Sequence, residues 1–421
     1  MQQDYDYIIV CAGVCGLVLA KELAAKGKSI LVLEKGGFIN KLGTVWYAAL
    51  FYDHVALLKS KQGVTIYRTF GVGGTSIVSC GNAVDFTDSE YKRIGIDFKN
   101  EINQAKEECF VRSAGLQVGS ASRKIMQEAN RLGYTMQPMP KFALKERCYA
   151  CGCCAVGCPH GLRWHSGHLL GAIRERVDLI TGFSVRKVLE QGNRAVGIEG
   201  RHKGMTKRFY AEKIILSAGG LGTPIILQNS GIPAGENLFV DLFNMTYAQL
   251  KGFLQRKEVP MSVVCTKFHS SDGFVMAPFV DPNFIALFTG LTFSKLHYLF
   301  KIDGLVGIMT KVNDDCYGRV NIDGSIDKGC TEDDLKKLNK GSDIAKEILI
   351  ACGAQSEAIF VTKPKGAHPG GTAAIGQVVD KDLQTKLSGL YVCDASVLPF
   401  APGLPPILTL IGLSKWFAKR I

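Results

Sequence analysis

The strongest constraint on the fold is a strand, turn, helix and strand pattern within the first 34 residues. Residues 5–10 form a β-branched and aromatic run, residues 11–16 are mostly small, and residues 17–25 have the composition and apolar spacing of a helix. Residues 29–33 then form a second buried strand, which ends at Glu34. This order is a βαβ unit, so we predict an α/β fold with a parallel sheet.

The turn of this unit reads C-A-G-V-C-G and has the spacing of a dinucleotide-binding fingerprint. In that fingerprint the second glycine lets the backbone approach a pyrophosphate, the third permits close helix packing, and a later acidic residue binds a ribose. Gly13, Gly16 and Glu34 occupy these positions, whereas Cys11 stands where a first glycine would make the tight turn. The alternative is an α/β unit without a nucleotide, which the position of Glu34 disfavours.

A second glycine-rich stretch covers residues 70–82 and reads FGVGGTSIVSCGN. Gly73, Gly74, Thr75 and Ser76 would present successive backbone N–H groups and hydroxyls as an anion nest. Such a nest suits the same pyrophosphate. A plain glycine-rich turn is the alternative interpretation.

The centre of the chain changes from one strand pattern to another. A hairpin over residues 183–200 leads to a buried strand within 208–220, an arrangement that commonly covers the adenine side of a dinucleotide. We then predict a helix entered through Thr223 and Pro224, because proline suits a first helical turn. Strands of mixed polarity between residues 242 and 360 predict an antiparallel sheet, and residues 331–353 predict an amphipathic helix starting near Thr331.

Composition narrows the class of protein further. The chain has 421 residues, of which 47% are hydrophobic, so it can bury the cores of two or three domains. No apolar stretch reaches the roughly 18 residues that a membrane-spanning helix needs, and because residues 1–10 lack the pattern of a signal peptide, we expect the fold to begin near Asp4. The net charge of +12 comes from scattered Lys and Arg, which argues against nucleic-acid binding. We therefore expect a cytoplasmic protein, whose 14 cysteines serve metal or redox chemistry.

These motifs, taken in order, resemble the glucose-methanol-choline (GMC) oxidoreductases, which are FAD-dependent alcohol dehydrogenases and oxidases. The resemblance also covers GGLGTPIILQNSGI and the long carboxyl-terminal segment from HPGGTAAIG to GLPPILTLIG. It implies a Rossmann-like FAD-binding domain with an antiparallel-sheet substrate domain. We expect the FAD-binding domain to comprise residues 1–90, 140–241 and 361–421, with a cysteine-rich insert at 148–168. Residues 242–360, with parts of 91–139, would form the substrate domain.

The resemblance also implies a set of FAD-binding residues. Gly13, Gly16 and Glu34 would hold the ADP half, and Gly73, Gly74, Thr75 and Ser76 the pyrophosphate side. Val185 would meet the adenine through its backbone, and Asp394, followed by Ala395, would lie near the ribityl chain. A last helix beginning at Pro406 and Ile407 would direct its N-terminus at the flavin, where its partial positive charge stabilises the anionic reduced form.

His368, in the sequence AHPGGT, matches the active-site histidine of the family. A neutral imidazole can take the proton of a substrate hydroxyl while hydride leaves the carbon for flavin N5. The family usually adds a second His or Asn before the last helix, but this chain has Pro405, which offers neither a side-chain hydrogen bond nor an N–H. The chain is also shorter than typical members, so we expect a more open substrate site or one that a partner closes.

A cysteine run, CYACGCCAVGCP, places Cys148, Cys151, Cys154 and Cys158 at bacterial ferredoxin spacing. The pattern predicts a [4Fe–4S] cluster. Because the fourth cysteine of such a run ligates another cluster in two-cluster ferredoxins, Cys153 or Cys80 are alternative last ligands. A four-thiolate zinc site is the main rival and a redox disulfide the next.

Together these features predict an FAD-dependent dehydrogenase that oxidises a CH–OH group of a small molecule with His368 as base. The cluster would pass electrons to a one-electron carrier such as ferredoxin instead of to dioxygen. One alternative is a flavin and iron–sulfur reductase of a carbonyl or activated alkene. The other is a non-catalytic electron-transfer subunit.

Overall fold

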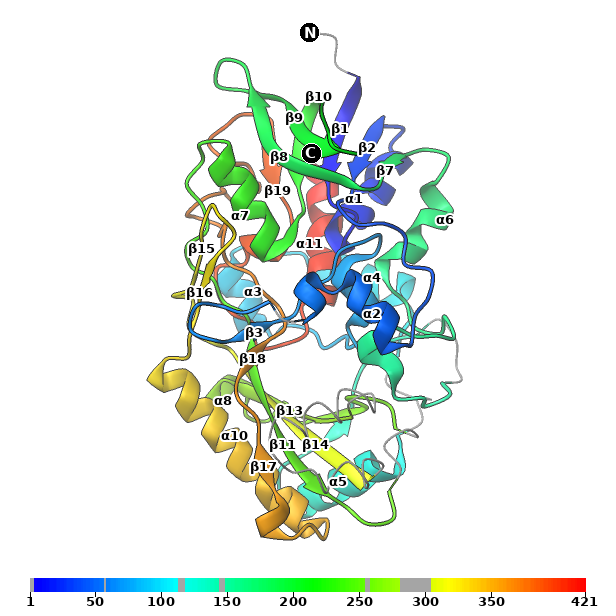
Figure 1. Cartoon of the computed structure of the whole chain (residues 1–421), viewed down its shortest axis with the longest axis vertical. Coiled ribbons are helices and arrows are strands. Elements are labelled where there is room, and N and C mark those ends of the chain that lie inside the picture. The colour runs from blue at the N-terminus through cyan, green and yellow to red at the C-terminus, as the bar shows by residue number, and fades with distance from the viewer. Residues whose placement is uncertain (1–3, 57, 113–117, 144–147, 254–257, 281–303) are drawn as a thin grey trace.

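The computed structural model describes residues 4–56, 58–112, 118–143, 148–253, 258–280 and 304–421. Two sheets follow one another along the long axis of the molecule (Figure 1). The sheet that contains the amino-terminal strand lies at one end, and the sheet that contains β11 and β14 lies towards the other. Each sheet has its own hydrophobic core.

The first sheet has the strand order β7-β2-β1-β10-β9-β8, with β19 beside β10. β1 pairs in parallel with β2 and with β10, and β2 pairs in parallel with β7. The strands are β1 (Tyr5–Val10), β2 (Ile30–Leu33), β7 (Asp178–Ile180), β8 (Phe183–Glu190), β9 (Ala195–His202), β10 (Met205–Leu216) and β19 (Leu390–Val392). The parallel sheet and its antiparallel hairpin confirm the predicted Rossmann-like architecture.

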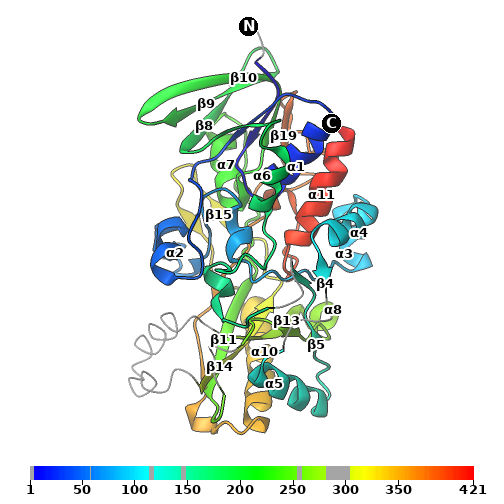
Figure 2. The same cartoon turned by 90° about the vertical axis from the view of Figure 1, so that its right-hand side faces the viewer.

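Helices cover this sheet and connect it to the rest of the chain. α1 (Val14–Ala25) packs against α11 (Ile407–Arg420), and α11 packs against α4 (Lys99–Glu108), as Figure 2 also shows. The buried Lys415 of α11 joins the three helices, because its Nζ lies 2.7 Å from both Glu22 of α1 and Glu108 of α4. Other helices are α2 (Val45–Phe51), α3 (Asp88–Ile94), α5 (Ser120–Arg131), α6 (Leu170–Ile173) and α8 (His269–Asp272).

α7 (Gly219–Asn229) begins earlier than the sequence predicted, so Pro224 lies inside the helix instead of at its start. Proline lacks the N–H that would bond the carbonyl four residues back. That carbonyl belongs to Gly220, and it accepts a 2.7 Å hydrogen bond from the Thr372 hydroxyl. A residue 152 positions away therefore satisfies the group that proline leaves open.

The second sheet has the order β13-β14-β11-β18-β3, with β17 beside β11. Its neighbours pair antiparallel except β18 and β3, which are parallel. The strands are β3 (Thr65–Ile66), β11 (Leu242–Gln249), β13 (Phe274–Phe279), β14 (Leu305–Val312), β17 (Phe360–Val361) and β18 (Lys365–Gly366). β3 and β18 come from segments that the sequence analysis assigned to the FAD-binding domain.

α10 (Glu332–Ala351) lies along this second sheet (Figure 1). The helix approaches β14 so closely that a Cβ on Gly341 would stand 2.2 Å from Thr310 Cγ2. Short strands complete the fold: β4 (Val111–Arg112), β5 (Gln137–Pro138), β6 (Lys141–Phe142), β12 (Val263–Val264), β15 (Arg319–Val320) and β16 (Ile326–Asp327). The antiparallel sheet predicted for residues 242–360 is thus confirmed, although residues 254–257 and 281–303 lie outside the described residues.

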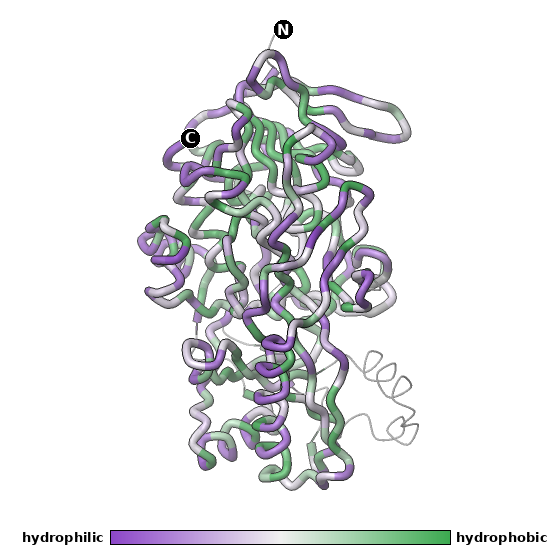
Figure 3. Tube along the Cα trace, turned by 90° about the vertical axis from the view of Figure 1, so that its left-hand side faces the viewer, coloured by the Kyte–Doolittle hydropathy of each residue, from purple (hydrophilic) through white to green (hydrophobic). Residues whose placement is uncertain are grey.

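The apolar residues of the chain concentrate in the first sheet. Figure 3 shows apolar chain concentrated in the strands of the first sheet and polar chain on the surrounding loops and helices. All four residues of β2 are buried. Among the helices in the described part of the chain, none combines the length and the apolar character needed to cross a membrane.

Candidate functional site

The dinucleotide turn between β1 and α1 is tightly closed. A Cβ on Gly16 would stand 2.0 Å from the Cys11 carbonyl oxygen, so only glycine fits there. Cys11 itself has a φ of 88°, in the left-handed region that favours glycine. This φ explains why the fingerprint has glycine at the position of Cys11. Here the cysteine adopts the backbone conformation that glycine favours.

Glu34 is buried and organises both glycine-rich segments. Its Oε2 accepts a 2.8 Å hydrogen bond from Ala12 N, and its Oε1 accepts bonds of 2.8 Å from Gly36 N and 3.0 Å from Gly71 N. Each carboxylate oxygen has two acceptor positions. The Glu34 carboxylate is therefore an anchor for the turn, and these three bonds leave one acceptor position, on Oε2, for the predicted ribose contact.

The second glycine-rich loop packs directly on the first. Gly73 N donates to Ala12 O at 2.8 Å, and a Cβ on Gly74 would stand 3.0 Å from the Gly13 Cα. Gly73 and Gly74 both have positive φ, 105° and 52°. The structure thus brings the two predicted pyrophosphate segments together, and Thr75 and Ser76 follow in a short 3₁₀ turn.

Ser166, near the end of the cysteine-rich insert, holds this loop in place. No local sequence pattern indicated this contact. Its hydroxyl donates to Gly73 O at 3.1 Å, and its N–H donates to Ser76 Oγ at 3.1 Å. Both partners are about ninety residues away in the chain.

Asp394 and Ala395 directly follow β19. Asp394 contacts the first residues of α7, and Ala395 contacts the segment that follows His368. The buried Asp394 carboxylate accepts hydrogen bonds from Gly219 N, Thr223 Oγ1 and Ser396 N, at 2.8, 2.6 and 2.7 Å. Burial raises its pKa, although these hydrogen bonds oppose the shift. Ala395 O accepts from Gly371 N at 3.1 Å.

Val185 lies in β8, at the far side of the same sheet. It is half-buried and pairs with Gly200 of β9, at an irregularity between Val185 and Lys187. The register of the β8–β9 pairing therefore shifts next to Val185, the residue whose backbone is predicted to contact the adenine. The contact itself stays a prediction.

His368 is held through one ring nitrogen. Its Nδ1 lies 2.9 Å from Asp241 Oδ2 and 2.8 Å from Lys311 Nζ. Lys311 Nζ lies 2.9 Å from the same Asp241 oxygen. Burial and the Lys311 charge lower the pKa of His368, while the Asp241 hydrogen bond works in the opposite direction. In the described part of the chain no hydrogen bond uses Nε2, so this nitrogen is the one available to a substrate.

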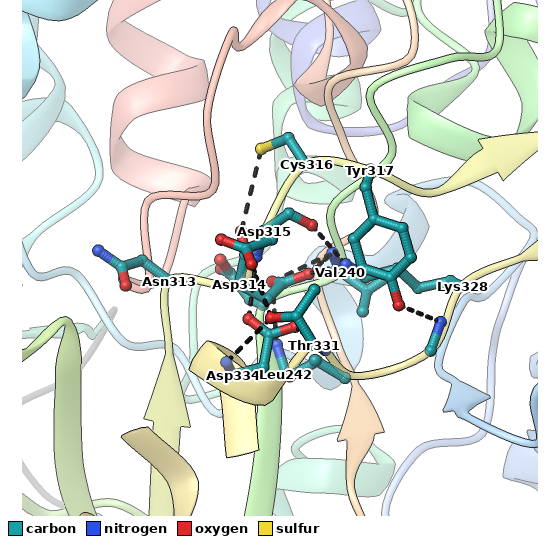
Figure 4. A network of polar contacts seen from close by, with 12 residues as sticks. Val240, Leu242, Asn313, Asp314, Asp315, Cys316, Tyr317, Lys328, Thr331 and Asp334 are labelled. Carbon is teal, nitrogen blue, oxygen red and sulfur yellow. Dashed lines mark hydrogen bonds and ion pairs between the residues drawn. The ribbon is translucent and has the colours of Figure 1, made fainter. Parts of the chain in front are cut away.

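A second buried ion pair, Asp314 with Lys328, holds the backbone on both sides of Asp241; Figure 4 shows Asp314 beside Val240 and Leu242. The Asp314 carboxylate accepts hydrogen bonds from Val240 N and Leu242 N, the residues on either side of Asp241. Lys328 Nζ lies 2.8 Å from Asp314 Oδ2, and both side chains are fully buried. Burial raises the pKa of Asp314 to about 6, against the opposing effect of Lys328.

The start of α11 lies beside the histidine network. Gly403 N, just before Pro406 and Ile407 at the helix N-terminus, donates to Asp241 Oδ1 at 2.9 Å. The hydroxyl of Thr409, in the first turn, is buried without a hydrogen-bond partner among the described residues. An unpaired buried hydroxyl and free N–H groups at a helix N-terminus fit a polar, anionic ligand group. These features and the two glycine loops fit FAD.

The four cysteines of the ferredoxin-like run line one cavity. Cys148, Cys151, Cys154 and Cys158 all contribute to its wall, whereas Cys153 and Cys80 do not. The Cys153 thiol instead donates to Cys151 O at 3.2 Å. In the described residues no group of three or more His, Cys, Asp or Glu side chains has the arrangement of a metal site.

A buried arginine beside these cysteines fits a negatively charged group. Arg163 Nη2 lies 3.3 Å from Cys154 Sγ, while its Nε and Nη1 are buried without a partner among the described residues. Burial lowers the pKa of Arg163, but the thiols of Cys154, Cys80 and Cys148 more than compensate and raise it. A buried cation without an anion costs several kcal/mol. A cluster of ligated thiolates would add negative charge beside Arg163, in a cavity wall that also contains the buried Glu258.

A second buried basic side chain, Lys141, lies near the same cavity. Its Nζ is fully buried and donates to Cys80 O, Asn82 Oδ1 and Pro260 O. Burial lowers the pKa of Lys141 to about 7. Its three hydrogen-bond partners are neutral oxygen atoms, whereas a buried carboxylate, Glu258, lines the cavity itself.

Comparison with known proteins decides the family. Two family models described as GMC oxidoreductase match residues 5–243 and 331–414. The chain belongs to the GMC oxidoreductase family. Members of this family bind FAD and act on CH–OH donors.

Individual relatives agree with this assignment. An uncharacterised protein of Methanocaldococcus jannaschii is 30% identical, covering 99% of this chain and 100% of that protein. An uncharacterised GMC-type oxidoreductase of Mycobacterium tuberculosis is 24% identical, covering 99% and 75%. A long-chain-alcohol oxidase of Arabidopsis thaliana is 22% identical, covering 99% and 67%.

A solved structure shares the fold. The crystal structure of pyridoxine 4-oxidase from Mesorbium loti superposes with a TM-score of 0.75 at 15% identity and covers 99% of both chains. At this identity the match shows the architecture alone.

Proposed function

We propose that this GMC oxidoreductase is an FAD-dependent dehydrogenase that oxidises a CH–OH group with His368 as the base. The observation that carries this proposal is the position of His368. Its Nδ1 is fixed by buried groups, its Nε2 is left for a substrate, and the shared Asp241 ties it to the loop before α11. A base must hold a free lone pair near the working pH, which a histidine with a lowered pKa provides.

In this function the residues of the chain bind the cofactor and move one proton. Gly13, Gly16, Gly73 and Gly74 would let backbone approach the pyrophosphate, and the N-terminus of α11 would face the flavin. Bound FAD supplies the hydride acceptor. His368 Nε2 would take the hydroxyl proton as the alcohol becomes a carbonyl.

We further propose that Cys148, Cys151, Cys154 and Cys158 hold a [4Fe–4S] cluster. The convergence of these cysteines on one cavity and the unpartnered Nε and Nη1 of Arg163, among the described residues, support the proposal. Such a cluster exchanges single electrons, so a one-electron carrier would serve as the final acceptor. Arg163 in the cavity wall is three residues from Ser166, which bonds the Gly73 loop, so the Cα atoms of these two residues are at most about 10 Å apart.

Cofactor analysis tests both parts of the proposal. Protein purified without air is expected to contain about one FAD and about four irons with matching sulfide, and its broad visible absorption should bleach with dithionite. A Cys151→Ala and Cys154→Ala double variant should lose iron and retain flavin. Zinc in place of iron would make the cysteine run a structural site, and absence of any metal would remove the cluster from the proposal.

Replacement of His368 tests the chemistry. Wild-type protein is mixed anaerobically with a panel of primary and secondary alcohols, and flavin reduction is followed near 450 nm, so no electron acceptor need be known. With any alcohol that reduces the flavin, His368→Asn should slow reduction by about 10²–10⁴-fold. His54→Asn is the matched control, because the His54 side chain is 70% exposed. Equal rates in both variants would exclude His368 as the base, and flavin oxidation by carbonyl compounds would indicate the reductase alternative.

A further inference from the structure

We propose that Asp241 and Lys311 form a positioning pair for His368, in which Asp241 orients the imidazole and Lys311 keeps it uncharged. This inference rests on the proposed function, in which His368 Nε2 takes the substrate proton. Asp241 directly precedes β11, and Lys311 lies in β14. Neither residue belongs to a motif that the sequence revealed.

The geometry at Nδ1 assigns the role of Asp241. A ring nitrogen carries either one N–H or one lone pair, so Nδ1 cannot donate to Asp241 and accept from Lys311 at once. When Nδ1–H donates to Asp241 Oδ2, at 2.9 Å, the lone pair lies on Nε2, as a base requires. Asp241 therefore selects the reactive tautomer.

Lys311 acts as a neighbouring charge. It is almost fully buried, with 3% of its side chain exposed, and its Nζ lies 2.8 Å from Nδ1. A like charge this close opposes formation of an imidazolium. Since Lys311 also donates to Asp241 Oδ2, it prevents the carboxylate from drawing a proton onto the ring before substrate arrives.

The pair is rigidly held. Asp241 has a φ of 49°, which is unusual for a residue with a side chain, and the Asp314 carboxylate holds the N–H groups on both sides of it. Gly403 N occupies the other carboxylate oxygen of Asp241. In the described part of the chain, the charged groups facing the ring are Asp241 and Lys311, with Asp314 and Lys328 behind them. Two acidic side chains thus pair with two lysines.

Proton and electrons balance in the step that the pair would serve. The substrate O–H bond would break as the Nε2–H bond forms, and bound FAD would supply the acceptor for the hydride that leaves the carbon. The imidazolium that results keeps its Nδ1–H on Asp241, so the carboxylate stabilises the charge that develops during reaction.

A direct measurement of His368 protonation tests the pair. Protein labelled with ¹³C in the histidine ring is titrated by NMR, and the His368 signal is assigned by its absence in His368→Asn. Lys311→Met should raise the pKa of His368 and Asp241→Asn should lower it, each by about 1–3 pH units. Lys311→Arg keeps the charge and should restore the wild-type titration.

The same variants have a kinetic readout. The acid limb of flavin reduction by a reactive alcohol should move to higher pH in Lys311→Met and to lower pH in Asp241→Asn. Asp241→Asn should also slow the reaction at its optimum, because the tautomer is no longer selected. If a single variant leaves too much buried charge to fold, the Lys311→Met and Asp241→Asn double variant is neutral, and its His368 should titrate between the two extremes while reacting slowly.

The outcomes separate this inference from the proposed function. A His368 pKa that stays unchanged in both single variants, or moves in the same direction in both, overturns the inference even if His368→Asn abolishes flavin reduction. Opposite shifts in the two variants support it. Opposite shifts combined with full activity of His368→Asn overturn the proposed function and, with it, the catalytic role of the pair.

Discussion

At the residue scale, Cys11 carries a measurable cost. Its φ of 88° lies in the region where residues with a side chain are strained by about 1–2 kcal/mol. Cys11→Gly should therefore stabilise the protein by about 1 kcal/mol, after the greater flexibility of glycine in the unfolded chain is allowed for. Urea unfolding at a fixed FAD concentration measures the change.

Cys11→Ala is the matched control for this prediction. Alanine keeps a Cβ and hence the strain, while it removes the thiol. If Cys11→Ala stabilised the protein as much as Cys11→Gly, the thiol and not the backbone conformation would be responsible.

At the element scale, α10 depends on its N-cap residue, Thr331. Thr331 accepts a 3.1 Å hydrogen bond from Asp334 N, and the Asp334 carboxylate accepts one of 2.9 Å from Thr331 N, which is a capping box (Figure 4). The Thr331 hydroxyl also donates to Asp315 Oδ2 at 2.6 Å. Thr331→Ala should cost about 1–2 kcal/mol of unfolding free energy.

Thr331→Ser provides the comparison for this helix. Serine retains the hydroxyl, so its variant should unfold close to the wild-type urea midpoint. Because α10 packs on β14, which carries Lys311, hydrogen exchange in Thr331→Ala should rise first in α10 and the adjacent strand. A uniform increase over the whole chain would contradict this local effect.

At the scale of the whole molecule, bound FAD should contribute to stability. The two glycine loops, the α7 start and the α11 start come from four separate parts of the chain, so a ligand that contacts them binds only the folded protein. Free FAD at 100 times its dissociation constant should then add about 2.7 kcal/mol. Thermal unfolding of the flavin-depleted protein, with and without added FAD, measures this gain.

Gly16→Ala is the variant that isolates the binding turn. The added Cβ would stand 2.0 Å from Cys11 O, so the turn must open. This variant should be less stable and should also lose the increment that FAD adds. An unchanged increment would place the cofactor's main contacts elsewhere.

Much of the fold could be predicted from the sequence. The βαβ pattern, the second glycine loop, the hairpin of residues 183–200 and the capped helix after Thr331 are local features, and their elements are present in the structure. Local patterns succeed here because the same neighbouring residues decide hydrogen bonding, apolar periodicity and capping. The early start of α7 was not predictable, since it depends on Thr372.

The sequence by itself therefore determined the fold class, the FAD family, the candidate base His368 and the four cysteines as a group. Only the tertiary structure decided what surrounds them. Asp241 lies 127 residues from His368 and Lys311 lies 57 residues from it, while Ser166 closes a loop more than ninety residues earlier. A lone buried lysine, aspartate or arginine has no sequence pattern, because its partner is chosen by the packing of distant strands. For this reason the charges that set the chemistry of His368 and of the cysteine cavity became visible only in the folded molecule.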